Sequence, residues 1–350
     1  MAWHLQVPCF LLLAGGVSAS HPPQERTDPF KLVAAVESAK CAMSEGVSIV
    51  LSAAVQYKTG MMTHTPGDAS TDETLRQLYT AAAQAMLQNH VVNDFWVGFS
   101  DGASFGTYPN TDQFSIPNDP LLSPVVFVDQ QCDADGVCQL LDYFYTNIDT
   151  LQTMAPPFLS IEYDVLSRPW FLEGEAFLEP EWGSLFLSSD IPRSPLVCPT
   201  VPLEDPSGEF LGLARACVNL TRLGEEFERA FPEGTLLYLA ELSEGLPLMA
   251  ASTPDATISG GAQVLATEST NEAISLTANA LTMAVTAGDY DLTAPLGTPG
   301  FVHDGYYIQA MAVSKLGSLK IHRDESWVFV GAHPTHPSDF SYSFSGDRSS

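Results

Sequence analysis

From residue 91 onward the sequence alternates aromatic and β-branched runs with turn signals, and this alternation most constrains the fold. The runs "VVNDFWVGF" and "PVVFVDQ" each lead into an Asp-Gly step, which favours a tight turn between antiparallel strands. Another hairpin is expected around the turn at 206–208, followed by a short helix in "TRLGEEFERAF". From Gly234 the pattern repeats in smaller form, as two strands, a helix and two closing strands.

The segment before residue 91 has a helical pattern. Asp28 is expected to cap a long helix over 28–57, with Pro29 at its first position. Apolar residues recur along it at helical spacing. Ser70 and Glu73 form a capping-box pattern before a second helix. The sequence therefore predicts an α+β protein, in which a long N-terminal helix precedes two modules with antiparallel sheets.

These elements divide the chain into successive parts. We expect an N-terminal helical segment over 28–90, a first module over 91–232 and a smaller second module over 233–335. The remaining 336–350, "HPSDFSYSFSGDRSS", is a polar tail.

The first residues have the features of a secretory signal. A short apolar run, "CFLLLAGGV", ends at Val17-Ser18-Ala19, where small residues suit cleavage, so we expect a signal peptide over 1–19. The run is shorter than the roughly 20 apolar residues that a membrane-spanning helix requires. The mature chain is accordingly expected outside the cell or in the secretory lumen.

The cysteines agree with an oxidising compartment. Cys132 and Cys138 flank an Asp-Gly turn, and Cys198 and Cys217 lie equally far from the 206–208 turn, so each pair is expected to form a disulfide. Cys41 is then left as a buried free thiol or an intermolecular bridge. Because the cysteines lack zinc-ligand spacing, no metal site is expected.

Charge narrows the classes of partner. The chain has 42 acidic and 14 basic residues, for a formal charge of -28. Such a surface repels phosphate backbones, so nucleic acid is not expected as a partner. The sequon "NLT" makes Asn219 the expected glycosylation acceptor.

No motif in the chain indicates catalysis. "GFSDG" matches G-x-S-x-G around Ser100, but a nucleophile elbow needs a helix after the serine, and "ASFGTYP" has the pattern of a strand. Phosphate loops and dinucleotide fingerprints are absent from the sequence, so we expect neither an enzyme nor a cofactor.

One cation stands out in this acidic chain. Arg168 is the only Lys or Arg between Arg76 and Arg193, and it lies in "YDVLSRPWF". This stretch resembles the Tyr-Asp-x-x-x-Arg-Pro-Trp-Tyr signature of double Cache (dCache) extracellular sensor domains. The flanking "VGFSDGASFGTYP", "EWGSLF" and "SWVFVGAHP" resemble other strands of that family, so the resemblance extends over roughly 28–335.

The resemblance implies two stacked PAS-like modules along the long helix, with a small-molecule pocket in the membrane-distal module, 91–232. Family members that bind amino acids use a Tyr, the Arg and the Trp for the ligand carboxylate, which matches Tyr163, Arg168 and Trp170. Positions that serve the ammonium group in those members hold Phe171, Phe186 and Cys217 here. We therefore expect a carboxylate with an apolar body rather than an amino acid, in a pocket that includes Phe171 and Phe186.

The resemblance also implies signal transduction, with a membrane-embedded receptor portion missing from this chain, and it leaves open a homodimer through the N-terminal helix. The alternative is a structural or auxiliary extracellular module without a ligand. In that case Arg168 would pair with an acid such as Asp164, Glu173 or Glu175, contributing about 0–1 kcal/mol if the pair is exposed.

Overall fold

The structure, a computed structural model, describes residues 29–65, 73–109, 121–133, 135, 137–188, 193–230, 235–253, 257–259, 262–293, 300–321 and 326–335. The expected signal peptide and the polar tail lie outside these residues. The predicted α+β class is confirmed, with antiparallel sheets behind a long N-terminal helix. The described chain divides into two compact units, one of residues 38–223 and 314–321 and one of residues 29–37, 224–313 and 326–335.

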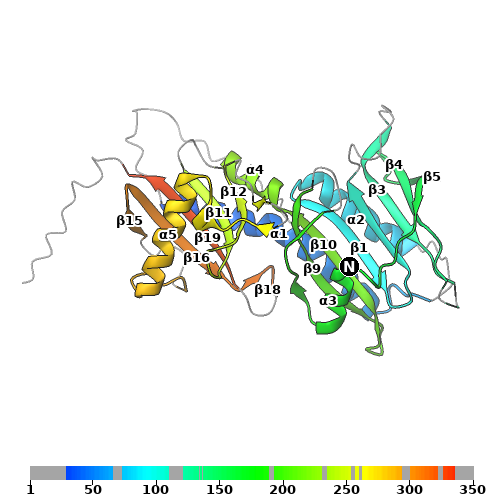
Figure 1. The fold of residues 1–350 in the computed structure, drawn as a ribbon. Coiled ribbons are helices and arrows are strands. Elements are labelled where there is room, and N and C mark those ends of the chain that lie inside the picture. Colours follow the sequence, from blue (N-terminus) through cyan, green and yellow to red (C-terminus); the bar gives the residue numbers. More distant parts are fainter. Residues whose placement is uncertain are drawn as a thin grey trace, which may run out of the picture. The chain divides into compact units, whose positions relative to one another are not determined.

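The long helix α1 runs from Pro29 to Lys58, as the sequence predicts, and α4 (Leu220–Ala230) leads from the first unit into the second. The other elements of the first unit are two helices and twelve strands, of which ten follow one path in its sheet (Figure 1). They are α2 (Glu73–Gln88), β1 (Val92–Phe99), β2 (Ser104–Pro109), β3 (Leu122–Gln130), β4 (Leu141–Asn147), β5 (Thr153–Ile161), α3 (Pro169–Phe177), β6 (Glu181–Trp182), β7 (Phe186–Leu187), β8 (Pro195–Val197), β9 (Pro199–Glu204), β10 (Phe210–Asn219), β17 (Lys315–Leu316) and β18 (Leu319–Ile321).

The order along that path is β17-β18-β6-β9-β10-β1-β2-β3-β4-β5. The expected turn between β1 and β2 forms at Asp101-Gly102, where the Gly102 φ of 95° is one that glycine adopts readily. One face of the sheet packs on helices, as where Tyr79 of α2 contacts Phe105 and Phe127. The other face, which includes Trp96 of β1, is left for the site described below.

Strands β17 and β18 join this sheet from far along the chain. β18 pairs in parallel with β6, and the indole nitrogen of the buried Trp182 donates a hydrogen bond to the Leu316 carbonyl at 3.0 Å. Nothing in the sequence pattern indicates this, because residues 315–321 follow the strands of the second unit. The first unit is thus completed by a late segment.

The second unit is a five-stranded antiparallel sheet with a helix packed on it. Its order is β12-β11-β19-β16-β15, and a separate two-stranded ribbon and a short 3-10 helix accompany it. These elements are β11 (Leu236–Glu241), β12 (Leu248–Ala251), β13 (Ile258–Ser259), β14 (Ala262–Gln263), η3 (Ala266–Glu268), α5 (Glu272–Ala287), β15 (Phe301–His303), β16 (Tyr306–Val313) and β19 (Trp327–Pro334).

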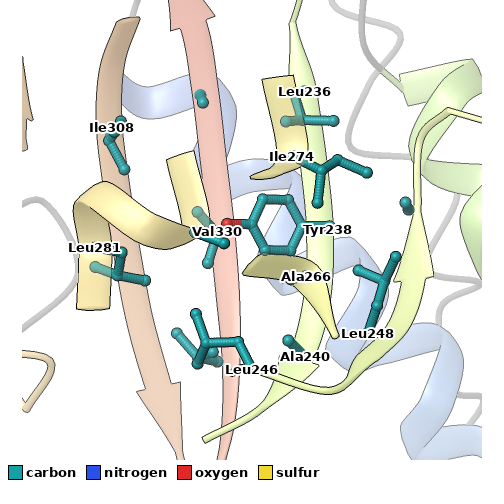
Figure 2. Packing of buried hydrophobic residues seen from close by; sticks show 14 of the residues in the cluster. Leu236, Tyr238, Ala240, Leu246, Leu248, Ala266, Ile274, Leu281, Ile308 and Val330 are labelled. Carbon is teal, nitrogen blue, oxygen red and sulfur yellow. The ribbon is translucent and has the colours of Figure 1, made fainter. Parts of the chain in front are cut away.

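The core of the second unit surrounds Tyr238. Its ring lies among apolar side chains of α5 and the sheet, including Ile274, Leu281 and Val330 (Figure 2). The phenol oxygen lies 3.4 Å from the Thr277 hydroxyl, and burial raises the pKa of Tyr238. Close packing of this kind stabilises the second unit around Tyr238.

Both expected disulfides are present in the structure, Cys132–Cys138 and Cys198–Cys217. The free-thiol alternative for Cys41 is wrong, because this cysteine is also disulfide-bonded. No described cysteine is free. Within the described residues, moreover, no helix combines the length and the apolarity needed to cross a bilayer.

Asn219 does not suit the glycosylation that its sequon predicts. The residue is 5% exposed, and its amide nitrogen, which would carry the glycan, donates to Asn93 Oδ1 at 3.2 Å. Its side-chain oxygen accepts hydrogen bonds from the backbone N–H groups of Thr221 and Arg222, which caps the start of α4. The sequon therefore encodes a helix cap, and the prediction of a glycan at Asn219 is corrected.

Two carboxylates face each other across β3 and β4, where Asp129 is paired with Asp142 in the strand register. Burial raises the pKa of Asp129 to about 6, and the nearby Asp142 charge contributes, although Gln131 donates to Asp129 Oδ1 at 2.7 Å and lowers it. The ordinary value is 3.8, so the folded protein holds this proton more tightly than the unfolded chain.

We therefore expect the free energy of unfolding to decrease as the pH rises through about 6. The raised folded pKa favours the fold fully below pH ~4, and this contribution, at most about 3 kcal/mol, is lost by pH ~7. Urea unfolding at a series of pH values would measure it. Asp129→Asn should flatten this part of the profile and Asp142→Asn should reduce it. An unchanged slope in Asp129→Asn would contradict this assignment.

Candidate functional site

The free face of the first unit's sheet lines a cleft of about 1100 Å³. Side chains of β1, β2, β4, β5, β9 and β10 form its floor, and α3 with the residues on either side of it forms its wall. Tyr163, Arg168, Trp170 and Phe186, all predicted from the sequence, line this cleft. The structure thus brings four of the five expected ligand-binding residues to one place.

Phe171 is the exception. It is 1% exposed and packs with Val165 and Leu213 behind the wall of the cleft, so it does not line it. On helix α3 consecutive side chains diverge by about 100°, and here Trp170 lines the cleft whereas Phe171 packs on Val165 and Leu213. The expectation that Phe171 contacts a ligand is therefore corrected: this side chain anchors α3 instead.

Arg168 is held at the start of α3 by the backbone. It is the N-cap residue, with extended φ and ψ of -75° and 137°, and Pro169 follows at the first helical position. Its carbonyl accepts hydrogen bonds from the N–H groups of Phe171 and Leu172, each at 3.0 Å. The fixed φ of proline suits this helix start, so the Arg-Pro-Trp step directs the two flanking side chains.

The guanidinium of Arg168 lies on an aromatic ring. Its central carbon is 4.2 Å from the ring centroid of Tyr163, which in turn stacks on Trp96 at 5.5 Å. Its Nε is buried and has no hydrogen-bond partner among the described residues. A cation over a ring is stabilised by the ring quadrupole, but its N–H donors are not satisfied by that contact.

No described carboxylate lies within ion-pair distance of Arg168. Asp164 instead accepts a hydrogen bond from the N–H of Leu166, and Glu173 accepts one from the Ser184 hydroxyl. Glu175 is exposed on α3. The pairing that the auxiliary-module alternative allowed for Arg168 is therefore not what the described residues form.

A second guanidinium lies across the cleft floor on β10. Arg215 is 8% exposed, and its central carbon lies 4.6 Å from the Trp170 ring and 5.5 Å from the Phe186 ring. Asp94 of β1 is its ionic partner, with Nη2 and Oδ1 separated by 3.9 Å. This separation exceeds hydrogen-bond length, and Arg215 Nε has no hydrogen-bond partner among the described residues.

Two indoles add further hydrogen-bond donors to the residues of the lining. The Nε1–H groups of Trp96 and Trp170 are buried and lack a hydrogen-bond partner among the described residues. In the strand register Trp96 lies directly opposite Arg215, so both side chains are on the same face of the sheet. Four buried N–H donors thus belong to two arginines and two tryptophans that line one cleft.

The remaining wall is apolar on one side and acidic at its rim. Phe186 packs on the Cys198–Cys217 disulfide, and Cys198 itself lines the cleft. Leu172 and Phe177 of α3 also line it and are 52% and 42% exposed. The carboxylates of Glu173, Glu179 and Glu181 belong to the same lining.

Sequence reasoning missed Trp96, Asp94 and Arg215. A signal for the two charged residues exists, because each interrupts a strand that is otherwise apolar, "VVNDFWVGF" and "FLGLARACV". Charged side chains are almost never buried unless they are paired or functional. The interruption indicates a site, but the pairing of Asp94 with Arg215 depends on a strand register that the sequence leaves open.

Ser100 does not lie on a nucleophile elbow in the structure. It lies in the turn between β1 and β2, so a strand and not a helix follows it. His64 stacks on Phe99 and bonds Asp101 Oδ2 at 2.8 Å, but no hydrogen bond joins it to the Ser100 hydroxyl. In the part of the chain that is described, His, Cys, Asp and Glu side chains form no cluster of three that could hold a metal.

Comparison with known proteins finds similarity only at the level of structure. No protein-family model matches the sequence. No curated protein matches it either. Solved structures that are similar to the chain are extracellular or periplasmic ligand-binding sensory domains of chemoreceptors and histidine kinases.

Three of these structures are representative. An extracellular ligand-binding receptor from Desulfohalobium retbaense is 9% identical over 88% of this chain, with a TM-score of 0.45, and this chain spans 40% of its length. The periplasmic sensory domain of the Campylobacter jejuni chemoreceptor Tlp1 is 9% identical, at 88% and 94% coverage and a TM-score of 0.46. The ligand-binding domain of the Pseudomonas aeruginosa amino-acid chemoreceptor PctC, in complex with GABA, is 11% identical, at 86% and 95% coverage and a TM-score of 0.42. At these values the similarity carries no inference about a ligand.

Proposed function

We propose that this chain is an extracellular, non-catalytic sensor module of the double Cache type that binds a small organic acid in the cleft of its first unit. The observation that carries the proposal is the Arg168 guanidinium, which lines the cleft without a carboxylate partner among the described residues, in a chain with 42 acidic residues. Arg168 is half-buried, and its buried Nε has no acceptor among the described residues, which is costly, so its position is best explained by an anion that arrives from solution.

The donors favour a carboxylate over other anchors. Arg168 Nε and the indole N–H groups of Trp96 and Trp170 can only donate hydrogen bonds. A carboxylate offers two oxygens that accept from a guanidinium in a bidentate geometry and has lone pairs left for an indole. An amine or another cation would leave all of these donors unsatisfied.

The walls favour an apolar body on that acid. Tyr163, Trp170 and Phe186 present aromatic surface, and Leu172 and Phe177 present aliphatic and aromatic surface near the mouth. Apolar contact of this kind contributes about 25 cal/mol per Å² of ligand surface removed from water. The ligand is accordingly an acid whose carbon skeleton contacts these rings.

The sequence supports an extracellular location for the module. The expected signal peptide over 1–19 and the disulfides agree with an extracellular location, where disulfides persist. In this proposal a membrane-embedded portion outside the chain receives the signal. Pairing of two copies through α1 stays a prediction from the sequence.

A thermal-shift screen of residues 20–340 against matched carboxylates, amino acids, amines and purines tests the proposal. A ligand that binds only the native state stabilises it by about 2.7 kcal/mol at 100 times its Kd. We expect shifts with carboxylates that have an apolar body, and none with amines or purines. Shifts confined to amines or purines, or absent throughout, would contradict it and favour the auxiliary module.

A further inference from the structure

The second guanidinium of the cleft has a distinct position. Arg215 projects from the middle of β10, a central strand of the sheet, whereas Arg168 lies at the start of α3 in the wall. Trp170 links the two arginines, because its ring contacts the Arg215 guanidinium and it follows Arg168 by two positions in the chain. The cleft therefore offers cationic donors at two places.

Arg215 is held in place without being satisfied. The rings of Trp170 and Phe186 restrict the guanidinium, and Asp94 lies 3.9 Å away, close enough for attraction but too far for a hydrogen bond. Asp94 Oδ2 accepts from the Asn93 amide at 2.8 Å, which fixes the carboxylate in turn. A guanidinium whose Nε has no hydrogen-bond partner among the described residues is available to an acceptor that those residues do not supply.

The charges next to the cleft floor limit what that acceptor can be. Asp94 offsets the charge of Arg215, whereas Arg168 has no carboxylate within ion-pair distance among the described residues, although Glu173, Glu179 and Glu181 also line the cleft. A ligand carboxylate on Arg168 supplies the counter-charge that this guanidinium lacks, so the group that reaches Arg215 can be a neutral or an anionic oxygen acceptor. It cannot be an amine, because like charges at short range in a buried site repel strongly.

We infer that Arg215 is a second ligand-binding residue, which donates hydrogen bonds to an oxygen-bearing group at the ligand's other end and excludes amines. This inference rests on the proposed function and makes it more specific. The ligand class is an organic acid with a second oxygen acceptor, such as an amide or a second carboxylate, separated from the first by an apolar segment.

The test compares acids that differ only at the far end. Pentanoate, the dicarboxylate glutarate, its monoamide glutaramate and 5-aminopentanoate share one carbon-chain length and differ only at the end opposite the first carboxylate. Sets of shorter, longer and aromatic acids extend the series. Calorimetric titration of the wild type should show glutaramate- or glutarate-type acids binding at least about 10-fold more tightly than the matched alkyl acid, which corresponds to ~1.4 kcal/mol. The amino-terminated acid should bind more weakly than the alkyl acid.

The variant Arg215→Met separates this role from a structural one. It should bring the acids with a second acceptor to within about threefold of the alkyl acid, while the alkyl acid itself changes by less than about threefold. Because this variant leaves Asp94 buried without its cation, the double variant Arg215→Met with Asp94→Asn serves if the single variant does not fold. The amino-terminated acid should gain affinity in both variants.

The outcomes distinguish the two proposals. Equal losses for all acids in Arg215→Met, or equal binding of all acids by the wild type, would overturn the role of Arg215 and leave acid binding at Arg168 intact. If no acid of any length binds to the wild type, the proposed function fails, and the role of Arg215 fails with it.

Discussion

Replacing Arg168 with methionine is expected to remove ligand binding and leave the protein folded. Truncating one partner of a buried, hydrogen-bonded charge pair costs about 2–5 kcal/mol, so the affinity for the acid should fall roughly 30- to 4,000-fold. Stability should hold or increase, because the free protein has no carboxylate near this guanidinium among its described residues and methionine retains much of the apolar stem.

Calorimetric titration with the acid identified in the screen, together with urea unfolding of the ligand-free proteins, measures both effects. Arg193→Met is a matched control, since Arg193 is exposed and outside the cleft lining. Replacing Arg193 changes the net charge of the protein by the same amount as replacing Arg168. Solvent screens this exposed charge from the cleft, so the affinity should change by less than about threefold. An Arg168→Met protein that is strongly destabilised would instead identify Arg168 as structural.

The largest effect on stability is expected from Trp182→Ala. Trp182 is fully buried on β6, between β9 and β18, and is outside the cleft lining. Removing a buried tryptophan side chain costs about 3–5 kcal/mol. The same substitution leaves the Leu316 carbonyl without its indole donor, so β17 and β18 should detach most readily.

Urea unfolding by circular dichroism, with hydrogen exchange at residues 315–321, would measure this result. Trp182→Phe is the control, because it keeps most of the buried volume and loses the indole hydrogen bond, which should cost about 1–2 kcal/mol. If Trp182→Ala costs less than about 1 kcal/mol and residues 315–321 stay protected, the late segment is not integral to the sheet.

Features that depend on local patterns were predictable from the sequence. The helix over 28–57 follows from apolar spacing and Pro29, and the structure has it as Pro29–Lys58. The pair Cys132 and Cys138 follows from the short Asp-Gly loop between them. The same is true of Arg168, whose isolation in an acidic chain is visible in the sequence alone.

Features that depend on strand register or on long-range pairing were not predictable from the sequence. Asp94 and Arg215 meet because β1 pairs with β10 in one particular register, and a shift of one residue would turn Arg215 to the opposite face. The addition of β18 to β6 joins segments more than a hundred residues apart, which no local pattern encodes. The sequon at Asn219 could be read as a glycan site or as a helix cap, and burial decides between them.

The most direct test of acid binding follows the side-chain indole N–H signals in a two-dimensional ¹⁵N spectrum during titration with the acid. Trp96 and Trp170 have indole N–H groups that face no described acceptor, whereas the Trp182 group is already bonded to Leu316 and serves as an internal reference. Trp96→Phe and Trp170→Phe assign the signals. Acid binding in the cleft predicts a downfield shift of the Trp170 proton, that of Trp96 or both, with Trp182 unchanged. Saturable binding that moves neither the Trp96 nor the Trp170 signal would contradict it and place the acid elsewhere.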